Sequence, residues 1–166
     1  ATDTGSFKYS NTTERTHRIA ARLVATGLPV AEIGRRVFDE MSPARFRLLN
    51  RFVNSVTLLD GGRIAIGTVT AADMAESEAL EEDTEGLINF ARNIEGVEVA
   101  LLFREVDSHT VKLSLRSREG VNSAEIVRPL GGGGHAAAAG VTLELPLRQA
   151  TAVALRHVRE ALQDTL

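Results

Sequence analysis

The apolar residues change their spacing once along the chain, and this change constrains the fold more than any other feature. Up to about residue 56 they recur every three to four positions, as on one face of a helix. The Asp60-Gly61-Gly62 sequence then indicates a tight hairpin turn, and residues 63–69 alternate in the manner of a strand. This order predicts an α/β protein with a helical N-terminal third, followed by a mixed α/β layer domain with a boundary near residue 57.

Three helices are predicted in the first third. The first has Asn11 as its N-cap, a glutamate three residues later, and Gly27 at its end. The second begins at Pro29, and the third has Ser42 as its N-cap and Pro43 at its first position. The third helix should bury an apolar stripe formed by Phe46, Leu49, Val53 and Val56.

Two strands are predicted in the second part, at residues 97–105 and 110–116. The first is apolar on both faces, so it should be central in its sheet. The second alternates apolar and polar side chains, which directs Arg116 away from the core face. A further strand is predicted at residues 141–145.

The other segments of the second part are interpreted as helices and one acidic run. Helices are expected around residues 87–94, after a cap at Asn122 or Ser123, and over residues 150–162. The run at residues 76–85 contains six carboxylates, and we expect it to be a solvated, mobile surface segment.

Composition excludes several classes of protein. The net charge of -3 and the pI near 5.8 argue against an extended basic surface for duplex nucleic acid or an anionic membrane. The absence of cysteine excludes disulfides and thiolate zinc sites and fits a reducing cytoplasm. No apolar run approaches the length of a membrane span, and no signal peptide is visible. The chain begins without methionine, so we expect a processed chain or a piece of a longer protein.

The stretch GGGGHAAAAG at residues 131–140 has almost no side-chain bulk. A flexible linker is disfavoured, because the stretch lies between a predicted helix and a predicted strand and contains no serine. A close-packed turn, in which two backbones approach each other, is one remaining interpretation. An anion site formed by successive backbone N–H groups is the other.

Two further residues favour the anion site. His135 follows the glycines directly and can donate to a phosphate oxygen, and Arg116 offers a planar guanidinium that pairs bidentately with phosphate. Taken singly, His135 is more often a structural histidine and Arg116 a solvated strand residue. Together with the glycines they indicate recognition of a nucleotide phosphate. A Walker A loop is excluded, because no Lys-Ser or Lys-Thr follows the glycines.

These residues also resemble a known family. GGGGHAAAAG fits the G-G-G-H-x-x-A-A-G signature of the DHH-associated domain, which lies C-terminal to the catalytic domain in DHH-family phosphoesterases. The chain is similar to the branch of bacterial oligoribonucleases, or nanoRNases, that hydrolyse very short RNAs and 3'-phosphoadenosine 5'-phosphate. Residues 2–13, 82–103 and 112–118 agree as well, so the resemblance covers essentially the whole chain.

The resemblance implies two lobes, with a two-manganese centre in the N-terminal lobe and substrate recognition in the C-terminal lobe. Asp3 resembles the last metal-binding aspartate, but the Asp-His-His triplet that names the family does not occur. We therefore expect a C-terminal fragment. Its expected parts are a remnant of the catalytic lobe at 1–41, a connecting helix at 42–56 and the DHH-associated domain at 57–166.

The resemblance also implies a set of substrate-binding residues. They should grip the terminal phosphate, or the nucleotide distal to the cleaved bond, and so limit substrates to a few nucleotides. Asn89 and Arg92 are better interpreted as a solvated helix face. The expected binding residues are Arg116, Gly132, Gly133, Gly134 and His135, with Ser117 and Arg118 as weaker candidates.

The expected function is therefore the substrate-recognition half of a cytoplasmic, manganese-dependent phosphoesterase that acts on short RNA or a nucleotide. The fragment alone should be inactive, because a lone carboxylate cannot hold two metal ions. A stand-alone nucleic-acid or nucleotide binding module and a structural domain whose glycines only pack remain as alternatives. No membrane partner is expected, and exposed apolar faces on the N-terminal helices favour self-association.

Overall fold

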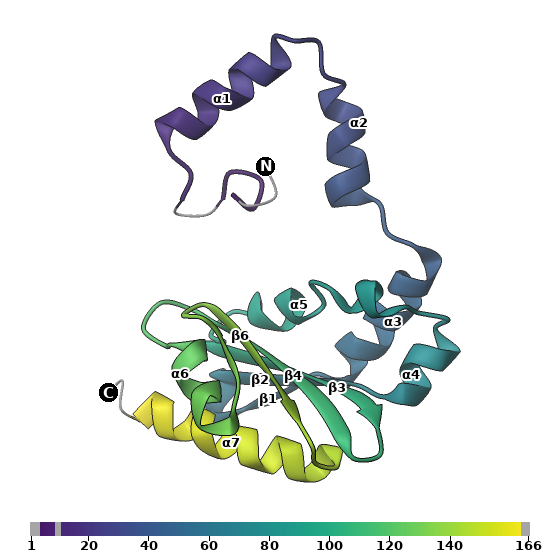
Figure 1. Cartoon of the computed structure of the whole chain (residues 1–166), viewed down its shortest axis with the longest axis vertical. Helices are drawn as coiled ribbons and strands as arrows, with labels where there is room; N and C mark the ends of the chain where they lie inside the picture. The colour runs from purple at the N-terminus through teal and green to yellow at the C-terminus, as the bar shows by residue number, and fades with distance from the viewer. Residues whose placement is uncertain (1–3, 9–10, 164–166) are drawn as a thin grey trace. The chain divides into compact units, whose positions relative to one another are not determined.

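The computed structural model describes residues 4–8 and 11–163 (Figure 1). The chain divides into two compact units, Ala1–Met41 and Ser42–Leu166. Across the described residues, no helix is both long enough and apolar enough to cross a membrane.

The first unit contains α1 (Glu14–Val24), α2 (Val30–Gly34) and a π-helical turn at Arg35–Asp39. Among the described residues, none of those in these three elements is buried. Thr13, and not Asn11, is the N-cap of α1. Its hydroxyl accepts from the backbone N–H of Thr16, while the Thr16 hydroxyl accepts from the Thr13 N–H. The predicted cap is wrong because the Thr16 hydroxyl completes a capping box two residues later than expected.

The second unit is built on a mixed six-stranded sheet in the order β1-β2-β3-β4-β6-β5. β2 and β3 are parallel, and every other neighbouring pair is antiparallel. The predicted mixed α/β class is thus confirmed, as is the interior position of the strand that is apolar on both faces. The strands are β1 (Thr57–Leu59), β2 (Ile64–Val69), β3 (Val99–Asp107), β4 (Thr110–Ser117), β5 (Gly133–His135) and β6 (Ala138–Leu143).

Helices cover both faces of this sheet (Figure 1). On one face, α6 and α7 enclose a core that contains Leu101, Phe103, Leu113 and Leu115. On the other face, α3, α4 and α5 pack against β2 and β3. The helices of the unit are α3 (Pro43–Ser55), α4 (Ala71–Glu76), α5 (Ile88–Arg92), α6 (Ser123–Val127) and α7 (Leu147–Gln163).

The buried face of α3 matches the predicted one only in part, because Leu49 and Val56 pack against the core as expected but the other two residues do not. Phe46 and Val53 are 63% and 49% exposed, whereas Leu48 and Phe52 are fully buried. Packing against the sheet selects the stripe that contains Leu48 and Phe52, because Gly67 on β2 leaves room for the Phe52 ring. A Cβ at Gly67 would lie 2.4 Å from that ring. The predicted start of α3 is confirmed, since Ser42 accepts from the Arg45 N–H and proline follows it.

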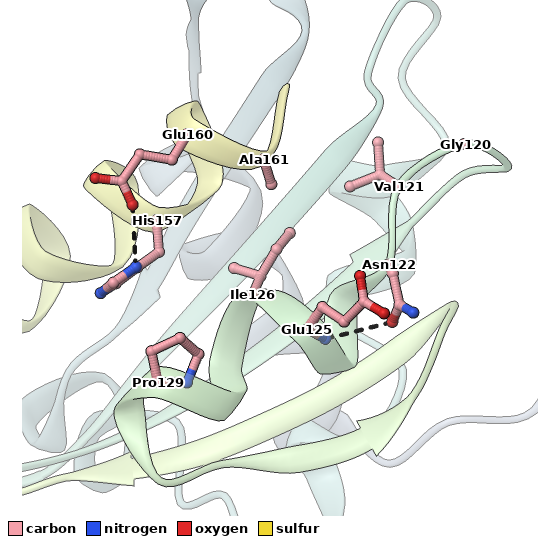
Figure 2. Close-up of a pocket in the computed structure, with 9 residues that line it drawn as sticks. All are labelled: Gly120, Val121, Asn122, Glu125, Ile126, Pro129, His157, Glu160 and Ala161. Atoms are coloured by element: carbon pink, nitrogen blue, oxygen red, sulfur yellow. Dashed lines mark hydrogen bonds and ion pairs between the residues drawn. The ribbon is translucent and has the colours of Figure 1, made fainter. Parts of the chain in front are cut away.

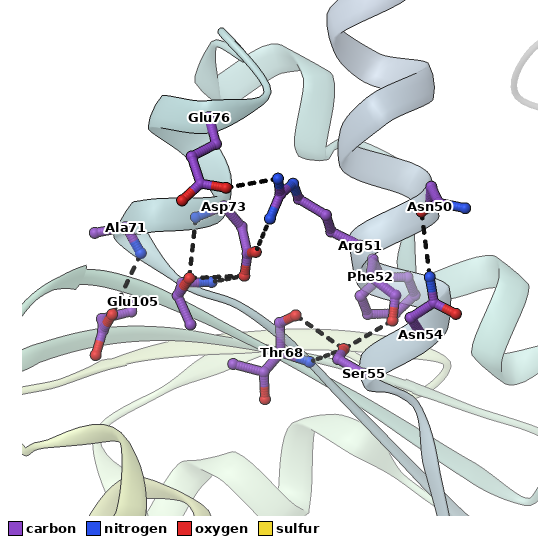
Figure 3. A network of polar contacts seen from close by, with 11 residues as sticks. Asn50, Arg51, Phe52, Asn54, Ser55, Thr68, Ala71, Asp73, Glu76 and Glu105 are labelled. Atoms are coloured by element: carbon purple, nitrogen blue, oxygen red, sulfur yellow. Dashed lines mark hydrogen bonds and ion pairs between the residues drawn. The ribbon is translucent and has the colours of Figure 1, made fainter.

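Polar contacts fix α3 to α4 and β2 (Figure 3). The Arg51 guanidinium lies 3.2 Å from a carboxylate oxygen of Asp73 and 2.6 Å from one of Glu76. The Ser55 hydroxyl donates to the Thr68 carbonyl at 2.9 Å and accepts from the Thr68 N–H at 2.8 Å. Together with the buried Phe52 ring, these bonds hold α3 against α4 and β2.

The sequence predicted a solvated surface segment at residues 76–85, but this is only partly correct. Three of its six carboxylates form ion pairs with arginine and lysine side chains, and Glu81–Thr84 forms a 3-10 turn. The correction has a physical reason, because basic residues on α3, β3 and β4 face the run. The pairs are Glu76 with Arg51, Glu78 with Arg47, and Glu81 with Arg104 and Lys112.

Candidate functional site

The glycine-rich stretch forms a hairpin at one edge of the sheet. β5 pairs antiparallel with β6, with residues 136–137 at the turn. The strand predicted at 141–145 thus begins too late, because β6 begins at Ala138. Alanine and glycine have low strand propensity, and here the neighbouring β4 supplies the pairing that the local sequence does not favour.

Three of the four glycines are required by the backbone itself. Gly131 has φ +83° and ends the 3-10 turn Arg128–Leu130. A Cβ at Gly132 would lie 2.6 Å from the Gly140 carbonyl oxygen. Gly134 has φ +145°, and its Cβ would lie 2.5 Å from the Ala138 carbonyl oxygen. The close-packed interpretation therefore accounts for these three positions.

Gly133 is different, because its Cβ would meet nothing within 4 Å and its φ is not positive. The fold thus gives no reason for a glycine at this position.

The expected run of open backbone donors is wrong at its first two positions. The Gly131 N–H donates to the Arg128 carbonyl at 3.0 Å, and the Gly132 N–H donates to the Val127 carbonyl at 2.9 Å. These two groups end the preceding turn and are not directed at a ligand. An anion on this surface would therefore be held mainly by side chains.

The strand register brings Arg116 and His135 into one row. Arg116 on β4 is the partner of Ala138 on β6, and Ala138 is the partner of His135 on β5. Side chains of directly opposed residues lie on the same face of a sheet. Two strand spacings put the Cα atoms of Arg116 and His135 about 10 Å apart, with only the Ala138 methyl between them.

The neighbouring row on the same face is nearly bare. Ser114, Gly140 and Gly133 are successive partners across β4, β6 and β5. The first is half-buried and the other two have no side chain. Arg116 and His135 therefore border a floor of main chain, onto which a methyl at position 133 would project.

Two hollows lie over this face. One, of about 260 Å³, is lined by the start of α5 and by Arg104, Lys112, Ser114 and Arg116. The other is shallower, follows the glycine run and shares Lys112 and Ser114 with the first. Together they make one continuous surface from α5 to β5. Below, the strand residues of this surface are called the cationic face: Arg104, Lys112, Ser114, Arg116, Gly133, His135 and Gly140.

One carboxylate lies at the border of the cationic face. The same Glu81 oxygen, Oε1, lies 2.7 Å from Arg104 Nη2 and 2.6 Å from Lys112 Nζ. The hydrogen bond from Lys112, with the charge of Arg104, holds the pKa of Glu81 below its ordinary value. Sequence reasoning missed both cations. Lys112 shares the polar alternation of Arg116, which is a usable signal, whereas Arg104 directly follows the apolar run at 99–103 and has no such pattern.

The weaker candidates lie outside this row. The Ser117 side chain is buried, its hydroxyl donates to the Val121 carbonyl at 2.7 Å, and it accepts from the Ser123 hydroxyl at 2.9 Å. Ser117 also lies 3.0 Å from the Ala136 carbonyl, so it anchors the tip of the hairpin that carries His135. Arg118 lines a different hollow beside Arg92.

A hollow on the α6 and α7 side does not involve the predicted binding residues. It measures about 360 Å³ and contains a His157–Glu160 contact of 3.3 Å (Figure 2). Asn122 at its edge is a helix cap, as predicted, because its side chain accepts from the N–H groups of Ala124 and Glu125. This hollow faces away from Arg116.

The described residues do not fit a two-manganese centre. Asp3 lies outside the described residues, and within residues 4–8 and 11–163 no group of three or more His, Cys, Asp or Glu side chains is arranged to hold a metal ion. His17 instead stacks on Phe7, with ring centroids 5.0 Å apart.

Comparison with known proteins identifies the family of the second unit and finds longer relatives of the chain. A family model described as the DHHA1 domain matches residues 63–164. The chain is 38% identical over 162 residues to the bifunctional oligoribonuclease and PAP phosphatase NrnA of Thermus thermophilus, covering 97% of this chain and 48% of that protein. It is 27% identical over 144 residues to an A-adding tRNA nucleotidyltransferase of Aquifex aeolicus, covering 86% of this chain and 17% of that protein.

Solved structures agree on the fold. The crystal structure of an exopolyphosphatase-related protein from Bacteroides fragilis has a TM-score of 0.88 at 25% identity, covering 96% of this chain and 47% of that one. A pGpG-specific phosphodiesterase, PggH of Vibrio cholerae, has a TM-score of 0.50 at 16% identity, covering 73% of this chain and 40% of that one. The chain thus spans about half the length of its Thermus relative and less of the Aquifex one.

Proposed function

The chain belongs to the DHHA1 domain family, and from this membership we propose that it is the substrate-recognition half of a phosphoesterase acting on short oligoribonucleotides or 3'-phosphoadenosine 5'-phosphate. In this proposal the chain holds the nucleotide end that is distal to the cleaved bond. The name of the Thermus relative, an oligoribonuclease and PAP phosphatase, supports this substrate class.

The observation that carries the proposal is the row Arg116–Ala138–His135 above a floor without side chains. A guanidinium can pair bidentately with phosphate oxygens, and an imidazole N–H can donate to a third. The bare floor lets a nucleotide approach the main chain closely. Gly132 and Gly134 contribute by keeping the hairpin close to β6, and Gly133 by leaving the surface open.

The division of labour follows from the residues that are present. Manganese dependence is proposed for a longer protein that contains the Asp-His-His residues, where metal ions would supply the hydrolytic chemistry. This chain would bind the phosphate, orient the nucleotide and limit its length. None of these three tasks requires a metal ligand from residues 4–8 or 11–163.

Binding of adenosine 5'-monophosphate, measured by calorimetry on this chain, tests the proposal. Loss of a charged hydrogen bond costs about 1.5–3 kcal/mol, so Arg116→Ala should weaken binding about 10- to 100-fold. His135→Ala removes one neutral hydrogen bond, and about a two- to tenfold loss is expected.

Arg148→Ala on α7 is the matched control, since it removes the same charge from an exposed residue on the other side of the sheet. It should leave affinity within about twofold, because solvent screens distant surface charges. Thermal unfolding of all variants should remain cooperative. If wild-type chain fails to bind the nucleotide, or if Arg148→Ala and Arg116→Ala have equal effects, the proposed function is wrong.

A binding module without catalysis is the second candidate. It is favoured by the similarity to part of an A-adding tRNA nucleotidyltransferase, which is named for a transfer reaction and not for hydrolysis. The two candidates differ in the activity of the longer protein. Release of mononucleotides from a diribonucleotide by that protein, in the presence of manganese, would support the phosphoesterase, and binding without release would support the module.

A further inference from the structure

Two cations face each other across neighbouring strands of the cationic face. Arg104 on β3 and Lys112 on β4 are direct register partners. Opposed residues of an antiparallel pair have Cβ atoms about 5 Å apart, and like charges at such positions destabilise the sheet. A negative charge beside the two cations therefore reduces their repulsion.

Glu81 supplies that counter-charge with a single oxygen. Its Oε1 is the acceptor for both cations, at 2.7 Å from Arg104 and 2.6 Å from Lys112. The Arg104 side chain is only 14% exposed, whereas the Glu81 side chain is 68% exposed. The cation is thus fixed in the sheet, and its partner lies at the surface on a short turn.

Arg104 and Lys112 line the same hollow as Arg116. Lys112 and Arg116 are four residues apart on one face of β4, so their Cα atoms lie about 14 Å apart along the strand. Long side chains bridge much of this distance. Two carboxylates, Glu81 and Glu85, line the hollow with these three cations.

We propose that Arg104 and Lys112 form a second anion subsite, closed in the free protein by Glu81, which accepts the second phosphate of a nucleotide whose first phosphate is held by Arg116. This inference rests on the proposed function and adds to it the number of phosphates that the site recognises. Glu81 is then a specificity residue, because a ligand with one phosphate leaves it in place and a ligand with two displaces it.

Displacement is favourable on electrostatic grounds. An exposed carboxylate paired with Lys or Arg contributes little, typically up to about 1 kcal/mol, because solvent screens it and a flexible side chain must be held. A phosphate carries a charge of about -1.5 to -2 and offers three acceptor oxygens to the same donors. Once Glu81 has moved, Arg104 and Lys112 have lost their shared acceptor, and the phosphate oxygens take its place.

The test compares adenosine 5'-monophosphate with adenosine 3',5'-bisphosphate on this chain by calorimetry. Glu81→Gln should strengthen bisphosphate binding about five- to tenfold and leave monophosphate binding within about twofold. Glu82→Gln is the matched control, because it removes the same charge from the next residue of the turn, which does not line the hollow. It should change neither affinity.

Lys112→Gln tests the subsite from the cation side, and it should weaken bisphosphate binding about five- to tenfold more than it weakens monophosphate binding. Equal gains in Glu81→Gln and Glu82→Gln would overturn the proposal, as would a Glu81→Gln chain that melts at lower temperature and gains no affinity. Monophosphate binding that depends on Arg116 while these bisphosphate effects fail would reject the second subsite alone. Absent monophosphate binding would reject the proposed function itself.

Discussion

At the scale of single residues, the four consecutive glycines have separate roles. Gly131 ends a turn, and Gly132 and Gly134 allow close backbone contacts. Gly133 has open space where a Cβ would be, on the same face as Arg116 and His135. The proposed ligand is the one reason for a glycine at that position.

Gly133→Ala should therefore separate binding from folding. The added methyl meets no protein atom within 4 Å, so the free energy of unfolding should be unchanged within about 0.5 kcal/mol. Nucleotide affinity should fall, because the methyl occupies the floor of the cationic face. Calorimetry and urea denaturation on the same samples measure both quantities.

Gly134→Ala is the informative counterpart, one residue away on the opposite face. Its φ of +145° and a 2.5 Å contact to the Ala138 carbonyl oxygen predict a large loss of stability. Unaltered unfolding of this variant would show that the hairpin has another conformation. Intact affinity in Gly133→Ala would show that no ligand approaches the floor.

Sequence reasoning proposed Arg116 and His135 as binding residues but did not predict that they lie in one row across the sheet. Alternation along residues 110–116 was enough to direct Arg116 away from the core. Its position beside His135 depends on the β4–β6 register, which no local pattern contains. Arg104 was missed for a similar reason, because its partner across the sheet, Lys112, decides its environment.

At the scale of elements, packing decided what periodicity left ambiguous. The alternating strands β2 and β4, and β3 with its continuous apolar run, were predicted closely. α3 carries two overlapping apolar stripes, and the gap at Gly67 selects the one that contains Phe52. Of the hairpin β5–β6, only the later part of β6 was predicted, since the pairing of its glycine and alanine residues comes from contact with β4.

Gly67→Ala should loosen α3 from the sheet. A methyl 2.4 Å from the fully buried Phe52 ring must displace it, and overpacking of this kind costs about 1–3 kcal/mol. The midpoint of urea unfolding should fall accordingly. Gly133→Ala is the control for adding the same methyl to a strand, and a Gly67→Ala chain as stable as the control would contradict the packing described for α3.

A pH-dependent contact links the turn after β1 to α7. The Arg159 guanidinium donates to both Asp60 oxygens at 2.8 Å, and these hydrogen bonds hold the pKa of Asp60 below its ordinary value of 3.8. The folded chain therefore releases this proton more readily than the unfolded chain. The stabilisation is present above about pH 4 and is lost as the pH falls through the lowered pKa.

Asp60→Asn should accordingly lower the melting temperature at pH 7, and the difference from wild type should shrink below about pH 4. Asparagine suits the left-handed φ of +52° at this position, so the backbone is preserved. Circular dichroism melts between pH 7 and pH 3 measure the effect. A difference that grows with acidification would contradict the assigned sign.

At the scale of the whole molecule, the proposed recognition role belongs to the second unit. Its second unit carries the cationic face, and the part of the chain that the structure describes has no cluster able to hold a metal ion. The division into a lobe remnant, a connecting helix and a recognition domain remains a prediction. In the structure, the helix at 43–55 packs within the second unit.

This chain alone should not hydrolyse a diribonucleotide, even with manganese added. The Asp-His-His triplet is absent from its sequence, and hydrolysis on two metal ions needs several ligands that bridge them. Chromatography of products after prolonged incubation is the measurement. Turnover that rises with protein concentration and survives Asp3→Asn would require a catalytic centre of another kind.

Arg116 and His135 lie on strands of one sheet and not on loops, so their relative position depends on the number of residues in the hairpin. One residue inserted at positions 136–137 would invert His135 to the opposite side of the sheet, because side chains alternate with a period of two. Two inserted residues would restore its direction but displace it by about 7 Å along the strand. The distance between the two side chains can thus change only in whole residue steps, and the hairpin length fixes which step is used.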